Sequence, residues 1–514
     1  MQQFFNFPIR AFFAYREERI VILHTLAIES QERWFTYLMK MGSKTLFGEK
    51  HGITAKTTYG EFTQKIPVQD YNTLFPYIDR IVSGETDVLW STPIDWLAKS
   101  SGTSQGKSKF IPVSDESLKE NNIMSAMDCL TIYTNLFPDT ELFSGKTITL
   151  GGSMQELYKE SPLRCGDVSA ILMENMPAIG LYLNAPQNKR ILLHSNWEYK
   201  LKLMAKSTIK ENVTGLSGVP SWMLLVLKEV LAKSGKESLA EVWPNIEVFF
   251  HGGVSFDPYR AEYEKIFAPK KLFYMNIYNA SEGFFGIQNE RDSDDMLLLT
   301  DNGVFYEFRE LNEESGDQEI VIPLSEIKVG PIYAMIVTTV AGLWRYEIGD
   351  TIQFTSIHPY KFRIAGRTTH FINAFGEELI VNNAEKAISE AALISDAIIT
   401  NYSAAPLFLD ENKKKGGHQW VVEFSKSPSS LELFASSLDA ALQRLNSDYE
   451  AKRSGDLLMA PPKIEVVQEG TFIKWLELRN RLGGQYKIPR LQNDRKIVEE
   501  LLMISDIISH PDRF

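Results

Sequence analysis

The chain has 514 residues, of which 44% are hydrophobic and 23% charged, the composition of a globular protein with about two to four domains. Its 54 basic and 66 acidic residues give a net charge of −12, which excludes a broad polyphosphate-binding surface, so we expect no nucleic-acid partner. The sequence contains neither a run of about 18 apolar residues nor the continuous apolar stretch of a signal peptide, so we expect a cytoplasmic chain without a membrane span.

The apolar pattern predicts helices over the first 60 or so residues. From about 90 to 380, short apolar strands alternate with helical stretches, which is typical of an α/β sheet. An amphipathic helix is predicted over 221–233, opened by Pro220 and closed by Gly235. Beyond about 382, two strand-like runs, a helix over 431–449 and the strand KIEVVQ predict a small α+β domain. We therefore expect a large α/β domain over residues 1–380 and a smaller one over 381–514. Cys129 and Cys165 lack CxxC spacing and are expected to be buried thiols.

The first chemical motif is SSGTSQGKSK, from Ser100 to Lys109. Its glycines let backbone N–H groups face an anion, while hydroxyls and lysines add donors and positive charge, which favours a phosphate-binding loop. It is not a Walker A loop, because only three residues separate Gly102 from Gly106-Lys107 and a β-like run follows it. An ordinary polar hairpin turn is the alternative.

The second motif, Tyr278 to Gly283, follows a predicted strand. Its carboxylate, Glu282, could hold Mg²⁺ beside a triphosphate, or could be a solvated residue or helix cap. The third motif, Trp344 to Asp350, precedes another strand. Asp350 could accept the hydroxyls of a ribose, or could be a turn residue beside a surface arginine.

In this order the segments SSGTSxGxxK, YxxSE and RxxxGD resemble the adenylate-forming superfamily, and in detail its Gretchen Hagen (GH3) branch, the acyl acid amido synthetases. The resemblance continues through a hinge-like segment from Gly366 to Gly376 and ends with GQYKIPR from Gly484 to Arg490. The hinge pattern commonly has Asp at the place of Thr369 and Lys at that of Asn373, so only Arg367 is carried over from it.

The resemblance implies an ATP- and acyl-acid-binding N-terminal domain, a mobile C-terminal domain, and the cofactors ATP and Mg²⁺. It implies that Glu282 holds the metal and acts in catalysis with Lys487, that Asp350 binds the ribose, and that Arg367 sits at the pivot. The remaining implied nucleotide contacts are Ser100, Ser101, Gly102, Thr103, Ser104, Gly106 and Lys109 at the phosphates, Gly252, Gly253 and Val254 at the adenine, and Tyr278, Asn279, Ala280 and Ser281 near the AMP.

The helix that begins near Pro220 would line the acyl pocket, which makes Val219 and Trp222 candidates for contact with the acid; the alternative is that Trp222 is a core residue. The implied reaction adenylates a small carboxylic acid and transfers its acyl group to an amine, usually that of an amino acid. An acyl-coenzyme A ligase and a non-catalytic adenylate sensor remain the alternatives, and GQYKIPR favours the amide. We expect a monomer.

Overall fold

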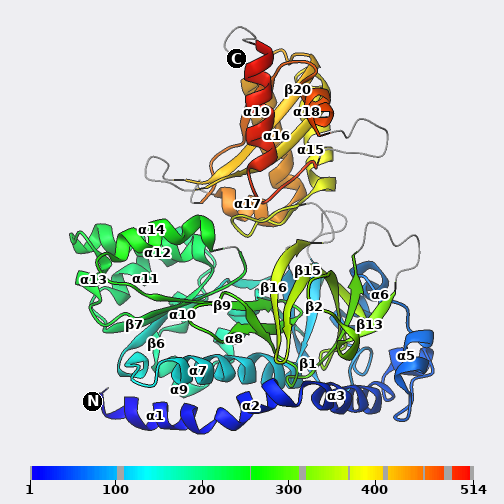
Figure 1. Ribbon diagram of the computed structural model, residues 1–514, viewed down its shortest axis with the longest axis vertical. Helices are drawn as coiled ribbons and strands as arrows, with labels where there is room; N and C mark the ends of the chain where they lie inside the picture. Colours follow the sequence, from blue (N-terminus) through cyan, green and yellow to red (C-terminus); the bar gives the residue numbers. More distant parts are fainter. Residues whose placement is uncertain are drawn as a thin grey trace. The chain divides into compact units, whose positions relative to one another are not determined.

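The computed structural model describes residues 3–100, 109–254, 256–311, 320–367, 371–408, 415–454, 458–479 and 489–509. Within these ranges the contacts divide the chain into two compact units. The first contains residues 3–100, 109–253 and 263–367, and the second contains residues 254 and 256–262 and the described residues from 371 onward. In Figure 1 the first unit runs from blue to yellow-green, and the second is mostly yellow to red.

Helices open the first unit, as the sequence predicts. Thr58 and Asp70 begin two of them through reciprocal capping boxes, which satisfy backbone N–H groups that have no partner inside the helix. The helices are α1 (Gln3–Tyr15), α2 (Glu17–Thr25), α3 (Ala27–Gly42), α4 (Leu46–Lys50), α5 (Tyr59–Lys65) and α6 (Tyr71–Val82).

A mixed sheet forms the centre of the first unit. Its parallel part consists of β3 (Lys146–Leu150), β6 (Asn184–Ala185), β7 (Val213–Gly218), β8 (Val248–His251) and β9 (Phe273–Ala280). Its antiparallel part consists of β10 (Gly283–Gln288), β11 (Met296–Leu298), β12 (Val304–Glu310), β13 (Val321–Pro323), β14 (Ile332–Thr339), β15 (Tyr346–Ile357) and β16 (Tyr360–Arg367). The strand order is β13-β12-β14-β15-β16-β11-β10-β9-β8-β7-β3-β6.

A smaller sheet carries the first motif. Its strands are β1 (Ile94–Ser100), β2 (Lys109–Ser114), β4 (Met154–Gln155) and β5 (Arg164–Gly166), in the order β2-β1-β5-β4. The other helices assigned wholly or partly to the first unit are the π-helix η1 (Ser117–Ile123), α7 (Met124–Leu136), η2 (Leu142–Ser144), α8 (Val168–Glu174), α9 (Ala178–Tyr182), α10 (Lys189–Leu192), α11 (Trp197–Thr208), α12 (Pro220–Ser234), α13 (Leu239–Val242), α14 (Asp257–Phe267) and η3 (Leu324–Glu326). The residues of α14 are divided between the two units.

Both faces of the parallel strands are covered, because successive side chains on a strand point to opposite sides. Phe250 of β8 packs edge-on against Tyr133 of α7, whereas its neighbour Phe249 stacks on Tyr263 of α14. Figure 1 shows α7 with α1 and α2 on one side of these strands and α11, α12 and α14 on the other. The side chains of these strands are therefore covered by helices on both faces of the sheet.

The second unit contains the predicted small α+β fold. Its elements are β17 (Phe371–Ile372), β18 (Leu379–Ile380), α15 (Val381–Ile394), β19 (Ile398–Leu407), β20 (Gly417–Lys426), α16 (Leu431–Leu445), α17 (Ser447–Arg453), β21 (Lys463–Val467), α18 (Thr471–Leu478) and α19 (Lys496–Ser509). The helix predicted over 431–449 is two helices, because the Asn446 side chain accepts the N–H groups of Asp448 and Tyr449 and caps a new helix there. The division predicted at residues 380 and 381 lies inside the second unit, which already includes β17 and β18.

The last described segment of this unit is bonded to the sheet. Ser403 Oγ donates to the carbonyl of Pro489 at 2.8 Å. The Ala404 N–H donates to the carbonyl of Arg490 at 2.8 Å, and the Gln492 N–H donates to the carbonyl of Ala404 at 3.1 Å. The chain from 489 to 492 is thereby held along β19.

Candidate active site

The carboxyl ends of the parallel strands lie side by side. Leu150 pairs with Gly218, Gly218 with His251, and His251 with Asn276, so these four strands are in register at this edge. Ligands of open α/β sheets bind outside the carboxyl ends of the strands. The predicted residues that follow these ends, or lie at them, are Val219, Gly252, Gly253, Tyr278, Asn279, Ala280 and Ser281.

The glycines predicted near the adenine are required by close backbone packing. A Cβ at Gly252 would lie 2.3 Å from the carbonyl oxygen of Ile277 in β9. Gly253 has φ +83°, and a Cβ there would lie 3.3 Å from Cγ2 of Val219. A side chain at either position would displace the segment that follows β8 from its neighbours.

A hydrogen bond joins the second and third motifs. The Tyr278 hydroxyl donates to Oδ2 of Asp350 at 2.5 Å, and both side chains are buried, with 6% and 7% of their surface exposed. Three strands separate β9 from β15 in the sheet order, so the antiparallel part must curl to make this contact. Asp350 is therefore a buried strand residue, and the alternative of a turn aspartate is wrong.

Arg345 is also not on the surface. Its guanidinium binds both carboxylate oxygens of Glu307, each at 2.9 Å, and 5% of Arg345 is exposed. The Tyr59 hydroxyl donates to the same carboxylate at 3.0 Å. Burial raises the pKa of Glu307, and the positive charge of Arg345 opposes that shift. This pair fixes the chain that leads into β15.

The ends of the first motif lie next to the same strand. Ser100 and Lys109 pair across β1 and β2, so residues 101–108 begin and end at neighbouring positions. Lys109 Nζ donates to the Tyr346 hydroxyl at 3.3 Å and lies about 6 Å from the ring centroids of Tyr71 and Tyr346. Because Tyr346 precedes Asp350 on β15, the flanks of the first motif connect through this strand to Asp350 and Tyr278.

Glu282 lies in the two-residue turn between β9 and β10, where Gly283 pairs with Ala280. Only 9% of Glu282 is exposed, so it is neither a solvated residue nor a helix cap. A cavity of about 10 Å³, room for about one water molecule, lies beside this turn. It is lined by Pro112, Val113, Ser117, Asn121, Asn122, Ser281, Glu282, Gly283, Gly303, Val304, Thr339, Val340 and Ala341.

The candidate acyl-pocket residues differ in exposure. Val219 is half-buried at the start of α12, whereas 4% of Trp222 is exposed. The Trp222 ring stacks on Trp197 of α11 with centroids 4.1 Å apart and an interplanar angle of 24°. Lys200 Nζ lies 4.6 Å from the Trp197 ring and donates to the carbonyls of Gly151 and Gly152 at 2.6 and 2.8 Å. A buried lysine thus supports the aromatic pair.

Some predicted residues cannot be placed. Those outside the described residues are Ser101, Gly102, Thr103, Ser104, Gly106 and Lys487. Arg367 ends β16 and its backbone pairs with Asp350, but its side chain is not among those described. Val254 is grouped with the second unit.

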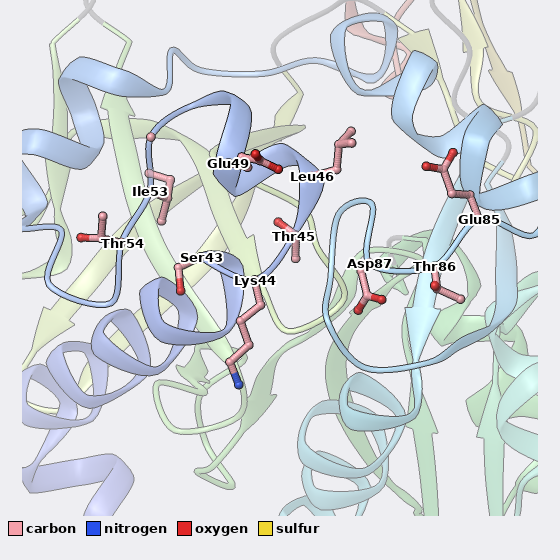
Figure 2. Close-up of a pocket in the computed structure, with 11 residues that line it drawn as sticks. Ser43, Lys44, Thr45, Leu46, Glu49, Ile53, Thr54, Glu85, Thr86 and Asp87 are labelled. Carbon is pink, nitrogen blue, oxygen red and sulfur yellow. The ribbon is translucent and has the colours of Figure 1, made fainter.

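A separate groove of about 560 Å³ lies between the turn before α4 and residues 85–87 (Figure 2). None of the predicted site residues that the structure describes lines it. Its carboxylates are exposed, and that of Glu85 is paired with Arg80. The groove is therefore not the predicted nucleotide site.

The described residues contain no group of three or more His, Cys, Asp or Glu side chains placed to hold a metal ion. Across the same ranges, no helix has the length and apolarity needed to cross a bilayer. Cys129 and Cys165 are free and buried, as predicted, and burial raises the pKa of the Cys165 thiol to about 12.

Sequence reasoning missed two groups that shape this region. Tyr346 lies within a recognised motif, but its bond to Lys109 joins residues 237 positions apart and leaves no local signal. Asn121 accepts the backbone N–H of Phe284, two residues after Glu282, and lies in a polar stretch that contains no motif.

Models of the GH3 family N-terminal, central and C-terminal domains match residues 16–272, 297–367 and 382–496. The chain belongs to the GH3 family. Among similar proteins, the indole-3-acetic acid-amido synthetase GH3.3 of Arabidopsis thaliana is 22% identical over 93% of this GH3 chain and 91% of its own length. The 4-substituted benzoates-glutamate ligase GH3.12 of the same plant is 23% identical over 86% of this chain and 88% of its own.

A solved structure described as AtGH3.15 acyl acid amido synthetase in complex with 2,4-DB has a TM-score of 0.61 to this GH3 chain, with 19% identity and 95% of each chain covered. This likeness shows a common fold. The family and the α/β fold predicted from the sequence are therefore confirmed, and with the family the expected class of enzyme, an amide-forming ligase.

Proposed function

We propose that this GH3 chain adenylates a small carboxylic acid with ATP and transfers the acyl group to the amine of an amino acid. The observation that carries the proposal is the pair of contacts Lys109–Tyr346 and Tyr278–Asp350, the second of which starts near the carboxyl end of β9. They connect the flanks of a phosphate-binding sequence to the residue expected at the ribose. The names of the relatives, amido synthetase and benzoates-glutamate ligase, support the amide product and the amino-acid acceptor.

In the first step a carboxylate oxygen of the acid attacks the α-phosphorus of ATP. The bond from that phosphorus to the β-phosphate oxygen breaks, and pyrophosphate leaves. Ser100, Lys109 and the residues between them, Ser101, Gly102, Thr103, Ser104 and Gly106 among them, would bind the phosphates through backbone N–H groups, hydroxyls and the ammonium group. Asp350, held by Tyr278, would bind the ribose hydroxyls. Gly252, Gly253, Val254 and the end of β9 from Asn279 to Ser281 would surround the base and sugar.

The residues fit Mg²⁺. This ion is usually bound in nucleotide sites by one or two carboxylates together with substrate phosphates, so a cluster of three acidic ligands is not needed. Glu282 supplies one carboxylate at the turn after β9, beside the small cavity. The ion, when bound, would neutralise charge on the phosphates. The side chain of Lys487 would add positive charge where negative charge develops on the reacting groups.

In the second step the amine nitrogen attacks the carbonyl carbon of the acyl adenylate, the bond to AMP breaks, and the nitrogen loses a proton. We propose that residues after about 380 move about a pivot at Arg367 between the steps. Arg367→Ala is then expected to slow turnover while leaving the melting temperature within about 1 °C of wild type. An unchanged turnover rate would contradict the pivot.

The acid itself would lie against the start of α12. Val219 is half-buried there, with Cγ2 at 3.3 Å from the position that a Cβ on Gly253 would occupy, and Trp222 follows about one helical turn later. Both are proposed to contact an apolar or aromatic acid.

We further propose that the chain acts in the cytoplasm and as a monomer. Light scattering of the purified chain tests the last point, and a mass near twice 58.5 kDa would contradict it.

Two assays separate this function from its rivals. Acid-dependent exchange of labelled pyrophosphate into ATP across a panel of acids tests adenylation, and the absence of exchange with every acid would favour a non-catalytic sensor. Mixtures of an active acid with amino acids or with coenzyme A are then analysed by mass. An amide is the expected product, and a thioester alone would reverse the assignment.

A further inference from the structure

The turn that carries Glu282 has little freedom of its own. Gly283 follows it with φ +157°, and a Cβ there would lie 2.9 Å from the ring of Phe285 and 3.2 Å from Oδ1 of Asn121. The direction of the Glu282 side chain therefore depends on what holds the backbone of Gly283 and Phe284.

Asn121 holds that backbone. Its Oδ1 accepts the N–H of Phe284 at 2.7 Å, and its Nδ2 donates to the carbonyls of Phe284 and Asn302 at 3.3 and 3.2 Å. Asn302 Nδ2 donates to the same carbonyl of Phe284 at 2.7 Å and to Ser125 Oγ at 3.2 Å. Both asparagines are buried, with 3% and 1% exposed. Two residues after Glu282, both backbone polar groups of Phe284 are thus hydrogen-bonded to these asparagines.

Asn121 lies in the π-helical turn η1, a geometry found often at functional sites. Asn121 and Asn122 also line the cavity beside Glu282. Oδ1 of Asn122 is buried and has no hydrogen-bond partner among the described residues, so this cavity combines an available acceptor with room for about one water molecule.

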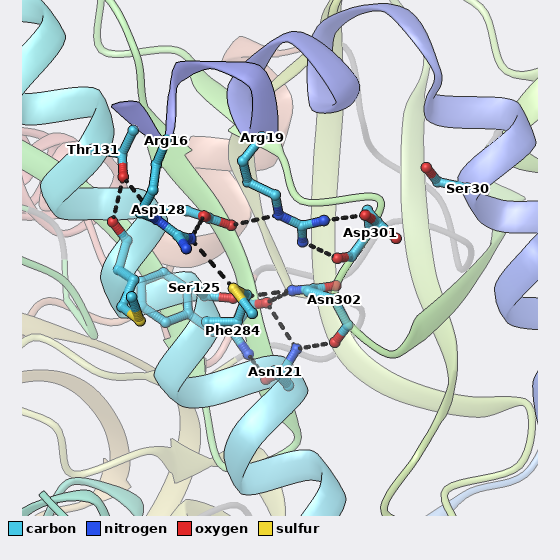
Figure 3. A network of polar contacts seen from close by, with 12 residues as sticks. Arg16, Arg19, Ser30, Asn121, Ser125, Asp128, Thr131, Phe284, Asp301 and Asn302 are labelled. Atoms are coloured by element: carbon cyan, nitrogen blue, oxygen red, sulfur yellow. Dashed lines mark hydrogen bonds and ion pairs between the residues drawn. The ribbon is translucent and has the colours of Figure 1, made fainter. Parts of the chain in front are cut away.

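The two asparagines are anchored in turn by charged residues (Figure 3). Asp301, next to Asn302, binds Arg19, and the same arginine contacts Asp128 of α7 at 3.4 Å. Arg16 binds Asp128 at 2.7 Å. The start of α2, α7 and the turn before β12 therefore form one connected support beneath the Glu282 turn.

We propose that Asn121, assisted by Asn302, is a positioning residue that orients Glu282 toward the metal-bound nucleotide. The inference rests on the proposed role of Glu282 in holding Mg²⁺. Replacing a residue that holds a metal-binding side chain in position typically lowers metal affinity by about 10- to 100-fold.

The test measures metal affinity without turnover. Mn²⁺ is titrated into protein and ATP in the absence of acid, and free Mn²⁺ is read by electron paramagnetic resonance. Asn121→Ser loses both donated hydrogen bonds and is expected to weaken Mn²⁺ binding at least 10-fold, with ATP affinity in the absence of metal changed less than 2-fold. Asn302→Ser is the second variant, should the first fail to fold. Asn245→Ser, at an exposed asparagine bonded to Asn212, is the matched control and should bind Mn²⁺ as wild type does.

Glu282→Gln distinguishes the proposed metal role of Glu282 from the proposed positioning role of Asn121. Unchanged Mn²⁺ affinity in Glu282→Gln would overturn the proposed metal role itself. Weakened binding in Glu282→Gln together with unchanged binding in folded Asn121→Ser and Asn302→Ser would overturn the positioning role alone. A lower melting temperature without loss of Mn²⁺ affinity would likewise reduce the two asparagines to a structural role.

Discussion

The buried Lys200 allows a quantitative test of the packing behind α11 and α12. None of this lysine is exposed, and burial lowers its pKa from 10.5 to about 8, against an opposing effect of the Asp167 carboxylate. At 1.36 kcal/mol per pKa unit this difference corresponds to about 3 kcal/mol. Because a denatured-state lysine stays protonated up to about pH 10.5, the unfolded chain binds more protons than the native one between about pH 8 and 10.5. In that window Lys200 therefore makes stability rise with pH, and below it the contribution is constant.

Lys200→Met removes the titrating group and keeps most of the side-chain volume. Urea unfolding at pH 7.5, 8.5 and 9.5, followed by tryptophan fluorescence, should show the wild type gaining stability relative to the variant by about 1 to 3 kcal/mol across this range. Lys202→Met, at an exposed position two residues later in α11, is the control and should run parallel to wild type. A constant difference between wild type and Lys200→Met would show that the lysine keeps its charge, and would refute the reasoning.

Three other changes test the site. Arg345→Met leaves the buried Glu307 carboxylate without its cation and should cost about 3 to 5 kcal/mol of unfolding free energy, whereas Arg80→Met at an exposed ion pair should leave the urea midpoint almost unchanged. Equal shifts of the urea midpoint in the two variants would contradict the expected effect of burial. Trp222→Ala should lower the unfolding free energy by about 3 to 5 kcal/mol and raise the KM of the acid, and an equal rise in the KM of ATP would count against its place in the acyl pocket. Lys487→Ala should lower the single-turnover adenylation rate by at least about 100-fold while ATP affinity falls less than about 5-fold, and equal losses would refute its role.

Much of the architecture could be predicted because it depends on local patterns. The apolar runs FYMNIYNA and IYAMIVTT are strands β9 and β14, with the predicted ends. The helix starting at Pro220 ends at Gly235, which has φ +67° as a left-handed cap requires. Segments that follow parallel strands could also be expected to lie near one another, because the carboxyl ends of parallel strands lie at the same edge of a sheet.

Contacts between distant segments could not be predicted from one sequence. The Tyr278–Asp350 bond depends on the curl of the antiparallel strands, which no periodicity encodes. The binding of Phe284 by Asn121 joins residues 163 positions apart, and Asn121 is an ordinary polar residue in a helical stretch. Asparagine favours helix starts, so Asn446 carries a signal for one, but the apolar pattern continues on both sides of it and predicts a single helix.

The docking of residues 489–492 along β19 has a mechanical consequence for Lys487. Two peptide links separate this lysine from Pro489, at most about 7 Å of extended chain. In the movement proposed between the two steps, Lys487 would therefore move together with the three-stranded sheet of β19, β20 and β21. Solvent friction on a unit of more than a hundred residues would then slow this movement. If the movement limits turnover, the turnover rate should fall as added glycerol raises the viscosity of the buffer.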